Sequence, residues 1–305
     1  MVVAILIVIL ASFLWAITNH IDKFLVCEID NSTNNMKTLL VFSSFVAGIV
    51  LIPIWLIISK FNISISIKSL LCIFMASIIY ILALCCYYKA LENNDASIVI
   101  AIQQLMPVFS YLLALVLFKE SLTIKQIIGS LIIVLSAILI SFDFGKKDNN
   151  NKFMALFYMT LYSFLGAIYW ILFDVAMRDS SYNTCAFWFQ IGLFLIGLFF
   201  LCIKSYRNSF ILSIRKNGKK YLSLNIINEF INLLGYLLMN YANVLIPIAL
   251  VNVINGFQGM FVFFLGVIGV IFMPKYFKED ISKSEIIQKV SCIILGIIGL
   301  IIIVI

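Results

Sequence analysis

Long apolar runs alternate with short polar stretches along the whole chain, and the clearest pair of runs lies between residues 96 and 142. Ala96–Phe118 carries no charged residue, and Ile127–Phe142 carries none either. An α-helix rises about 1.5 Å per residue, so roughly 20 apolar residues cross the hydrocarbon core of a bilayer. The short polar stretch that begins with Lys119 and Glu120 therefore predicts a tight turn at the membrane surface between two helices.

Ten segments of this kind are predicted to be transmembrane helices. Their apolar residues are continuous rather than alternating, which favours helices over the short strands of a β-barrel. The predicted segments are Val2–Thr18, Thr38–Ser59, Ser69–Leu91, Ala96–Phe118, Ile124–Phe142, Phe153–Ala176, Thr184–Ile203, Tyr221–Tyr241, Val244–Met273 and Ile286–Ile305.

The connections between these segments are short, with two exceptions. The polar stretches 19–37 and 204–220 are expected to be loops, and the second holds six basic residues. The ninth segment, Val244–Met273, is longer than one upright helix needs. We expect it to form a single helix that tilts, kinks or projects beyond the bilayer, because no strong turn signal divides it.

The composition is typical of a membrane protein. Hydrophobic residues make up 64% of the chain and charged residues 11%, whereas a soluble domain has about 25% charged residues. The net charge of +7 comes from basic residues that lie mostly in predicted loops. This placement indicates membrane orientation and contact with anionic lipid rather than nucleic-acid binding. We expect an integral, multi-pass protein of the plasma membrane.

The sequence does not support an enzyme or a metal site. The seven cysteines form no C-x-x-C pair, and the chain has one histidine. Packing roles explain such cysteines better than disulfides or metal ligands. The G-x-S-x-G, H-E-x-x-H and P-loop patterns are missing as well. We therefore expect no enzymatic activity, no metal and no cofactor.

The two halves of the sequence resemble each other. Phe13–Ile17 (F-L-W-A-I) recurs as Phe164–Ile168 (F-L-G-A-I), and Lys119–Thr123 is matched by Lys278–Ser282. Five segments per half is an odd number, so the second copy inserts upside down relative to the first. The predicted fold is an all-α polytopic membrane protein with ten transmembrane helices in two inverted five-helix repeats. The expected boundaries are 1–144 for the first repeat, 145–152 for a linker and 153–305 for the second repeat.

The distribution of basic residues predicts an orientation. Of the 21 Lys and Arg residues, sixteen fall on the face that holds the loops after the odd-numbered segments, and five fall on the opposite face. The positive-inside rule assigns the richer face to the cytoplasm, which places both termini outside.

Glu229 is the sharpest candidate for a functional residue. It lies in the eighth segment, and Asn225 and Asn228 share most of its helical face through spacings of three and four. A charge at the centre of a bilayer costs roughly 2.5–3.5 kcal/mol, so such residues usually face the bundle interior. Glu229 is expected to bind a substrate amine or to carry a coupling proton. The alternative is a structural carboxyl that bonds to a neighbouring helix.

Amide side chains form a second set of candidates. Asn252 and Asn255 follow each other at a step of three, and Asn255 corresponds to Gln103 or Gln104 through the repeat. Two helices would then bring amides to a matching depth around a pseudo-twofold axis. Amides both donate and accept, which suits a polar, zwitterionic or sugar-like solute. The alternative is that these amides only form hydrogen bonds between helices, which are worth about 0.6 kcal/mol each on average.

Three further residues are candidates for a gate or hinge. Pro107 lies inside the fourth segment, where a proline frees a backbone carbonyl for a ligand or a bend. Lys23 matches Asp174 through the repeat, and the two residues could pair across the axis as a salt-bridge gate. The alternative is that Lys23 and Asp174 both sit at the interface and extend to water.

The first half also carries a pattern at Trp15, Ala16, Asn19, Lys23, Tyr88–Leu91, Ala96, Ser97, Pro107 and Phe118–Gly129 (F-K-E-S-L-T-I-K-Q-I-I-G). This pattern resembles the drug/metabolite transporter superfamily, EamA type. In the second half only Glu279 and its surroundings match it. The resemblance implies ten helices in two inverted repeats, a central cavity and alternating access. It also implies termini inside the cell, which is opposite to the prediction from charge.

The sequence as a whole predicts a secondary active transporter for a small polar metabolite. The resemblance implies amino-acid-like, nucleotide-like or sugar-like solutes, often moved outward. A proton or ion that couples transport is expected from Glu229. Membrane lipid is the other expected partner, and no nucleic acid is expected. A non-transporting membrane receptor or lipid-handling bundle is the alternative, and the oligomeric state is left open.

Overall fold

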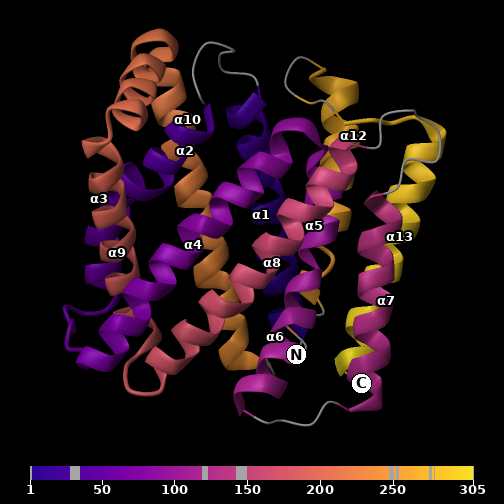
Figure 1. Ribbon diagram of the computed structural model, residues 1–305, viewed down its shortest axis with the longest axis horizontal. Coiled ribbons are helices and arrows are strands. Elements are labelled where there is room, and N and C mark those ends of the chain that lie inside the picture. Colours follow the sequence, from indigo (N-terminus) through magenta and orange to yellow (C-terminus); the bar gives the residue numbers. More distant parts are fainter. Residues whose placement is uncertain are drawn as a thin grey trace.

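The computed structural model describes residues 2–27, 35–118, 123–141, 150–246, 251, 254–274, 277 and 279–304. The regular elements of the described chain are helices that run side by side in one bundle (Figure 1). They are α1 (Val2–Cys27), α2 (Asn35–Val41), the π-helix η1 (Phe42–Val46), α3 (Ala47–Ile58), α4 (Ile67–Asn93), α5 (Ala96–Gln103), α6 (Leu105–Phe118), α7 (Ile124–Ser141), α8 (Asn150–Met177), α9 (Tyr182–Cys202), α10 (Lys204–Leu245), α12 (Gln258–Phe272) and α13 (Lys283–Val304).

The prediction of an all-helical polytopic membrane protein is confirmed. Within the described residues, eight segments are long and apolar enough to cross a membrane, and two shorter apolar helices lie at Ile124–Ile140 and Gln258–Phe272. Large apolar side chains such as Leu6, Leu131 and Phe272 remain exposed on the outside of the bundle. A lipid-facing surface explains this exposure, because there is no water to exclude within the hydrocarbon core.

Three antiparallel pairs of helices dominate the packing. α4 packs against α8 along its length, α1 packs against α10, and α7 packs against α13. The α7 and α13 backbones also cross closely, because a Cβ on Gly129 would lie 2.6 Å from the carbonyl oxygen of Gly299. Small residues at such a crossing let two backbones approach each other. The beginning of α1 and the end of α13 lie at the same end of the bundle (Figure 1).

Both of the predicted long loops are wrong in part, because helix extends into them. α1 continues to Cys27, and α10 begins at Lys204. Lys and Arg are good helix formers, so a basic stretch need not be a loop. Gly218 interrupts α10 with a φ of 62°, a left-handed conformation that glycine adopts without steric cost.

Two predicted continuous segments are divided in the structure. Turn residues Gly256 and Phe257 precede α12, which begins at Gln258, while Val244 and Leu245 belong to the end of α10. The expectation of one long helix over Val244–Met273 is therefore wrong, and Gly256 lies at the turn that precedes α12. The fourth segment divides at Gln104, between α5 and α6. Residues 145–149 of the predicted linker lie outside the described residues, and 150–152 belong to α8.

Candidate functional site

A cluster of polar side chains joins α1, α4 and α10 inside the bundle. Asn228 donates a hydrogen bond from Nδ2 to Oδ1 of Asp22 at 2.8 Å. The hydroxyl of Tyr87 lies 3.2 Å from the other carboxylate oxygen of Asp22 and donates to Oδ1 of Asn19 at 2.9 Å. The bonds thus link three helices through one carboxylate.

Glu229 extends this cluster by one residue along α10. It lies beside the hydroxyl of Ser43 and within electrostatic range of Asp22. The hydroxyl groups of Ser43 and Tyr88 are 2.9 Å apart. Glu229 also lines a small cleft with Asn225, whose amide donates to the carbonyl of Tyr221 at 2.9 Å. We call Asn19, Asp22, Ser43, Tyr87, Tyr88, Asn228 and Glu229 together the inner acidic cluster.

The local backbone explains how these side chains meet. Asn225, Asn228 and Glu229 share a helical face because they are three and four residues apart on α10. Asn19 and Asp22 share a face of α1 for the same reason. Ser43 belongs to the π-helix η1, and such one-turn widenings of a helix occur frequently at functional sites. Among the described residues, no Lys, Arg or His forms an ion pair with Asp22 or Glu229.

Two buried amide atoms in the inner acidic cluster lack a hydrogen-bond partner among the described residues. They are Nδ2 of Asn19 and Oδ1 of Asn228. Asn19 is 7% exposed and Asn228 is 4% exposed. Buried polar atoms nearly always have a partner, and an unpaired one costs roughly 1–3 kcal/mol. The pair of atoms is therefore available to a ligand or to water.

The predicted amides Gln104, just after α5, and Asn255, just before α12, lie apart from this cluster. Gln104 donates from Nε2 to the carbonyl of Gly256 at 3.2 Å, and Ser12 donates to Oδ1 of Asn255 at 2.9 Å. Ser12 precedes Asp22 by ten residues, which is roughly 15 Å along α1. The structure therefore separates Gln104 and Asn255 from Glu229. Asn252 lies outside the described residues.

Pro107 lies just after the break between α5 and α6. A proline has no N–H, so the carbonyl of Gln103, four residues earlier, receives no backbone bond from residue 107. The hydroxyl of Ser163 on α8 donates to this carbonyl at 3.5 Å. A bend in the fourth predicted segment is thus linked to a neighbouring helix through a side chain.

Lys23 and Asp174 do not form the predicted pair. The ammonium of Lys23 bonds the carbonyl of Leu91 at the end of α4, and Asp174 pairs with Arg178 at 3.6 Å. The end of α4 that Lys23 contacts lies beside the beginning of α8, as the contact between Lys89 and Tyr158 shows. Asp174 lies near the other end of α8, so the two residues are far apart. Lys23 instead stabilises unpaired carbonyls at the end of a helix.

A second charged cluster lies where α5 begins. Lys289 of α13 donates to Oδ2 of Asp95 at 2.5 Å, to Oε1 of Glu279 at 2.9 Å and to the carbonyl of Asp280 at 3.1 Å. Ser97 donates to the same Glu279 oxygen. Burial raises the pKa of Glu279 to about 7, and the nearby Asp95 carboxylate adds to this effect. We call Asp95, Ser97, Glu279 and Lys289 the terminal ion cluster.

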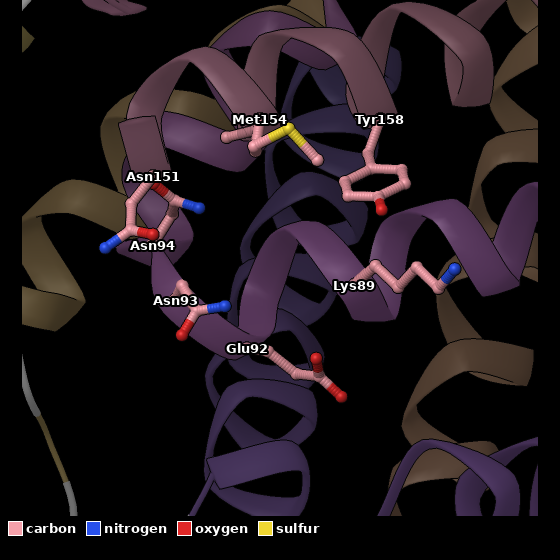
Figure 2. A pocket seen from close by; sticks show the side chains of 8 residues that line it. Lys89, Glu92, Asn93, Asn94, Asn151, Met154 and Tyr158 are labelled. Atoms are coloured by element: carbon pink, nitrogen blue, oxygen red, sulfur yellow. The ribbon is translucent and has the colours of Figure 1, made fainter. Parts of the chain in front are cut away.

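An open cleft of about 220 Å³ lies at the same end of the bundle. Its lining includes Lys89 and Glu92 of α4 and Asn151 and Tyr158 of α8. Figure 2 shows the Tyr158 ring turned toward the α4 helix that carries Lys89, and the Lys89 ammonium lies 5.3 Å from the centre of that ring. The lining is polar and largely exposed, unlike the inner acidic cluster.

Sequence reasoning missed Asp22 and the terminal ion cluster. Asp22 follows the predicted end of the first segment, Thr18, where the sequence predicts a loop. Asp95 precedes the fourth predicted segment, Glu279 lies between the ninth and the tenth, and Lys289 is the fourth residue of the tenth. A charge at such a position is ordinarily solvated. The one available signal was the pattern A-S at residues 96–97 together with K-E at 278–279, which the family resemblance singled out.

The described architecture defines a class of protein, an all-helical polytopic membrane protein with acids and amides enclosed between its helices. Residues 2–142 match the model of the EamA-like transporter family. The first half of the chain is therefore similar to this family of membrane transporters.

Comparison with solved structures and curated proteins gives two further results. A solved structure titled "Crystal structure of protein" is similar to this chain at 14% identity and a TM-score of 0.47, with 98% of this chain and 96% of the other covered. No curated protein matches the chain.

Proposed function

We propose that the protein is a secondary active transporter that moves a small polar metabolite across the plasma membrane by alternating access. The inner acidic cluster is the observation that carries this proposal. A carboxylate within a membrane span is expensive, and such residues usually mark a substrate or ion pathway. Asp22 and Glu229 lie deep among the helices, yet neither is completely covered. They are the groups of this site that bind the solute or a coupling proton.

The helix packing supports a fold of ten crossings in two inverted repeats. In such a fold, exchanging the halves maps the first crossing onto the sixth and the third onto the eighth. The contact between α1 and α10 would then be equivalent to the contact between α4 and α8, and both are extensive. The same exchange of the halves would map the α7–α13 pair onto itself. An axis that relates the halves in this way would place the inner acidic cluster near the centre of the bundle.

Two irregular stretches of backbone supply the bends that alternating access requires. One is the π-helix η1, which holds Ser43, and the other is the break at Gln104 beside Pro107. Hinges are usually a few residues at the ends of elements that absorb a change in φ and ψ. The proposed motion opens the inner acidic cluster to one side of the membrane and then to the other.

Transport by purified protein in liposomes tests the proposal. Radiolabelled amino acids, nucleosides, sugars and amines are offered one at a time, with and without a pH gradient. We expect saturable uptake of at least one solute and a loss of at least tenfold for Glu229→Gln and Asn228→Ala. Asp174→Asn is the matched control, because Asp174 is an exposed carboxylate paired with Arg178.

Two outcomes would contradict the proposal at different levels. If both cluster variants transport every solute like the wild type, the assigned site is wrong. If the folded wild type moves none of the solutes in either direction, the non-transporting receptor or lipid-handling bundle becomes the better description.

A further inference from the structure

We infer that the solute is a small protonated amine that also carries a hydrogen-bond acceptor, held by Asp22 and Glu229 beside a wall of tyrosines. This inference rests on the proposed transport function and names the class of its solute. Three independent features of the inner acidic cluster support it: its charge, its unpaired amide atoms and its aromatic surroundings.

The charge of the cluster calls for a cation. Asp22 and Glu229 are close enough to repel each other, and no basic side chain among the described residues forms an ion pair with either of them. Lys23, one residue after Asp22, bonds carbonyls at the end of α4 instead. Buried charges are ordinarily paired, because an isolated carboxylate in an apolar medium is very costly. A positively charged solute supplies the missing partner, and protons supply it when the solute has left.

The unpaired amide atoms define which hydrogen-bonding groups the solute must carry in addition to its charge. Asn228 uses Nδ2 to bond Asp22 and leaves Oδ1 without a partner, so a ligand there must present an N–H or O–H donor. Asn19 uses Oδ1 to accept from Tyr87 and leaves Nδ2 free to donate. A protonated amine donates to Oδ1 of Asn228, whereas a quaternary ammonium has no hydrogen to donate. A hydroxyl oxygen on the same solute accepts from Asn19.

Tyrosines surround these polar groups on several helices. The Tyr87 ring lies 5.4 Å from the Tyr88 ring and 5.8 Å from the Tyr162 ring of α8. Tyr80 and Tyr236 lie within electrostatic range of Glu229. Tyrosine faces attract cations, with about 2 kcal/mol or more available when the cation is desolvated. Rings of this kind favour an organic cation over a bare metal ion, which prefers a shell of oxygen ligands.

Uptake of radiolabelled ethanolamine into proteoliposomes is the direct test, because ethanolamine has one ammonium and one hydroxyl. Four comparison solutes test the ammonium: choline has a quaternary ammonium, alanine adds a carboxylate to a primary ammonium, glycerol is neutral and lactate is anionic. We expect ethanolamine to be taken up at least tenfold faster than glycerol or lactate. Asp22→Asn and Glu229→Gln should each reduce its uptake at least tenfold, and Asp174→Asn should not.

Asn228→Leu tests directly whether the Asn228 amide accepts a hydrogen bond from the solute. This variant should lose the preference for ethanolamine over choline, because Oδ1 no longer accepts from the ammonium.

The wild type alone provides a measurement that does not depend on a variant folding. Ethanolamine should raise its melting temperature in detergent, and an equal concentration of glycerol should not.

The possible failures separate this inference from the proposed function. If the wild type transports glycerol, lactate or alanine well and ethanolamine poorly, the amine assignment is wrong while transport stands. Uptake of choline equal to that of ethanolamine would refute the role of Asn228 as acceptor. If no solute crosses, the proposed function itself fails and the inference fails with it.

Discussion

The ammonium of Lys289 lies 2.9 Å from the carboxylate of Glu279, and the Lys289 side chain is 0% exposed. The same ammonium lies 2.5 Å from Asp95, which is 194 residues away in the sequence. One buried cation thus joins α13 to the start of α5 and to the stretch after α12. The terminal ion cluster fastens this end of the bundle in the conformation described.

Replacing the buried cation tests how far the bundle depends on it. Lys289→Met leaves Asp95 and Glu279 next to each other without a counter-charge, and breaking a buried pair in this way costs about 3–5 kcal/mol. We expect a large fall in the melting temperature in detergent. Lys283→Met, which removes an exposed lysine from the same helix, should change it little. Equal melting temperatures for the two variants would mean that Lys289 is not buried as described.

The pH dependence of stability provides a second test of the cluster. The pKa of Glu279 is raised to about 7 from 4.5 by burial and by the Asp95 carboxylate. The folded protein therefore retains a proton that the unfolded chain has lost between these pH values. The stability from this group is present below about pH 4.5 and is lost as the pH rises through about 7.

Comparison with Glu279→Gln isolates this effect from the other titrating groups. As the pH rises from 5 to 7.5, the melting temperature of the variant should rise relative to that of the wild type. Above pH 7.5 the difference between the two melting temperatures should stay constant. A difference that does not change over this range, or that shifts in favour of the wild type, would show that Glu279 is ionised throughout.

The crossing of α7 and α13 depends on glycine at its closest point. A Cβ at Gly129 would meet the Gly299 oxygen and the Ile303 side chain, each at 2.6 Å. Backbone cannot move aside cheaply, so Gly129→Ala should destabilise the protein by about 1–3 kcal/mol. Gly259→Ala is the control, because its nearest side-chain atoms would be 3.7 Å away. Thermal unfolding in detergent measures both, and equal effects would contradict the close crossing.

Much of the helical layout follows from the sequence, because a bilayer admits only segments that satisfy their own backbone bonds. The face of α10 with Asn228 and Glu229 was predictable as well, since spacings of three and four define it. Asp22 was not, because hydropathy ends the first span at Thr18 while the helix continues to Cys27. Partners on α4 and α10 stabilise Asp22 in this last part of α1. No local sequence pattern reveals these contacts.

The terminal ion cluster shows the same limit more strongly. Lys289 counts as a loop residue in the prediction of orientation, yet its side chain is wholly enclosed. Asp95 and Glu279 each read as ordinary charges at the edge of a span. Only the contact between segments far apart in the chain turns three separate loop charges into one buried group. Pairings of this kind depend on tertiary packing rather than on composition or periodicity.

Pro107 allows the proposed hinge to be tested by a single substitution. Pro107→Ala restores an N–H that is able to bond the Gln103 carbonyl and to continue helix across the break at Gln104. We expect the free energy of unfolding to rise by up to about 3 kcal/mol and the maximal transport rate to fall severalfold, because a stiffer segment bends less readily. Pro53 lies within α3 and is exposed, so Pro53→Ala is the matched control. It should stabilise the helix without slowing transport. If Pro107→Ala stabilises the protein and transports at the wild-type rate, the break beside Gln104 is a static bend and the motion lies elsewhere in the bundle.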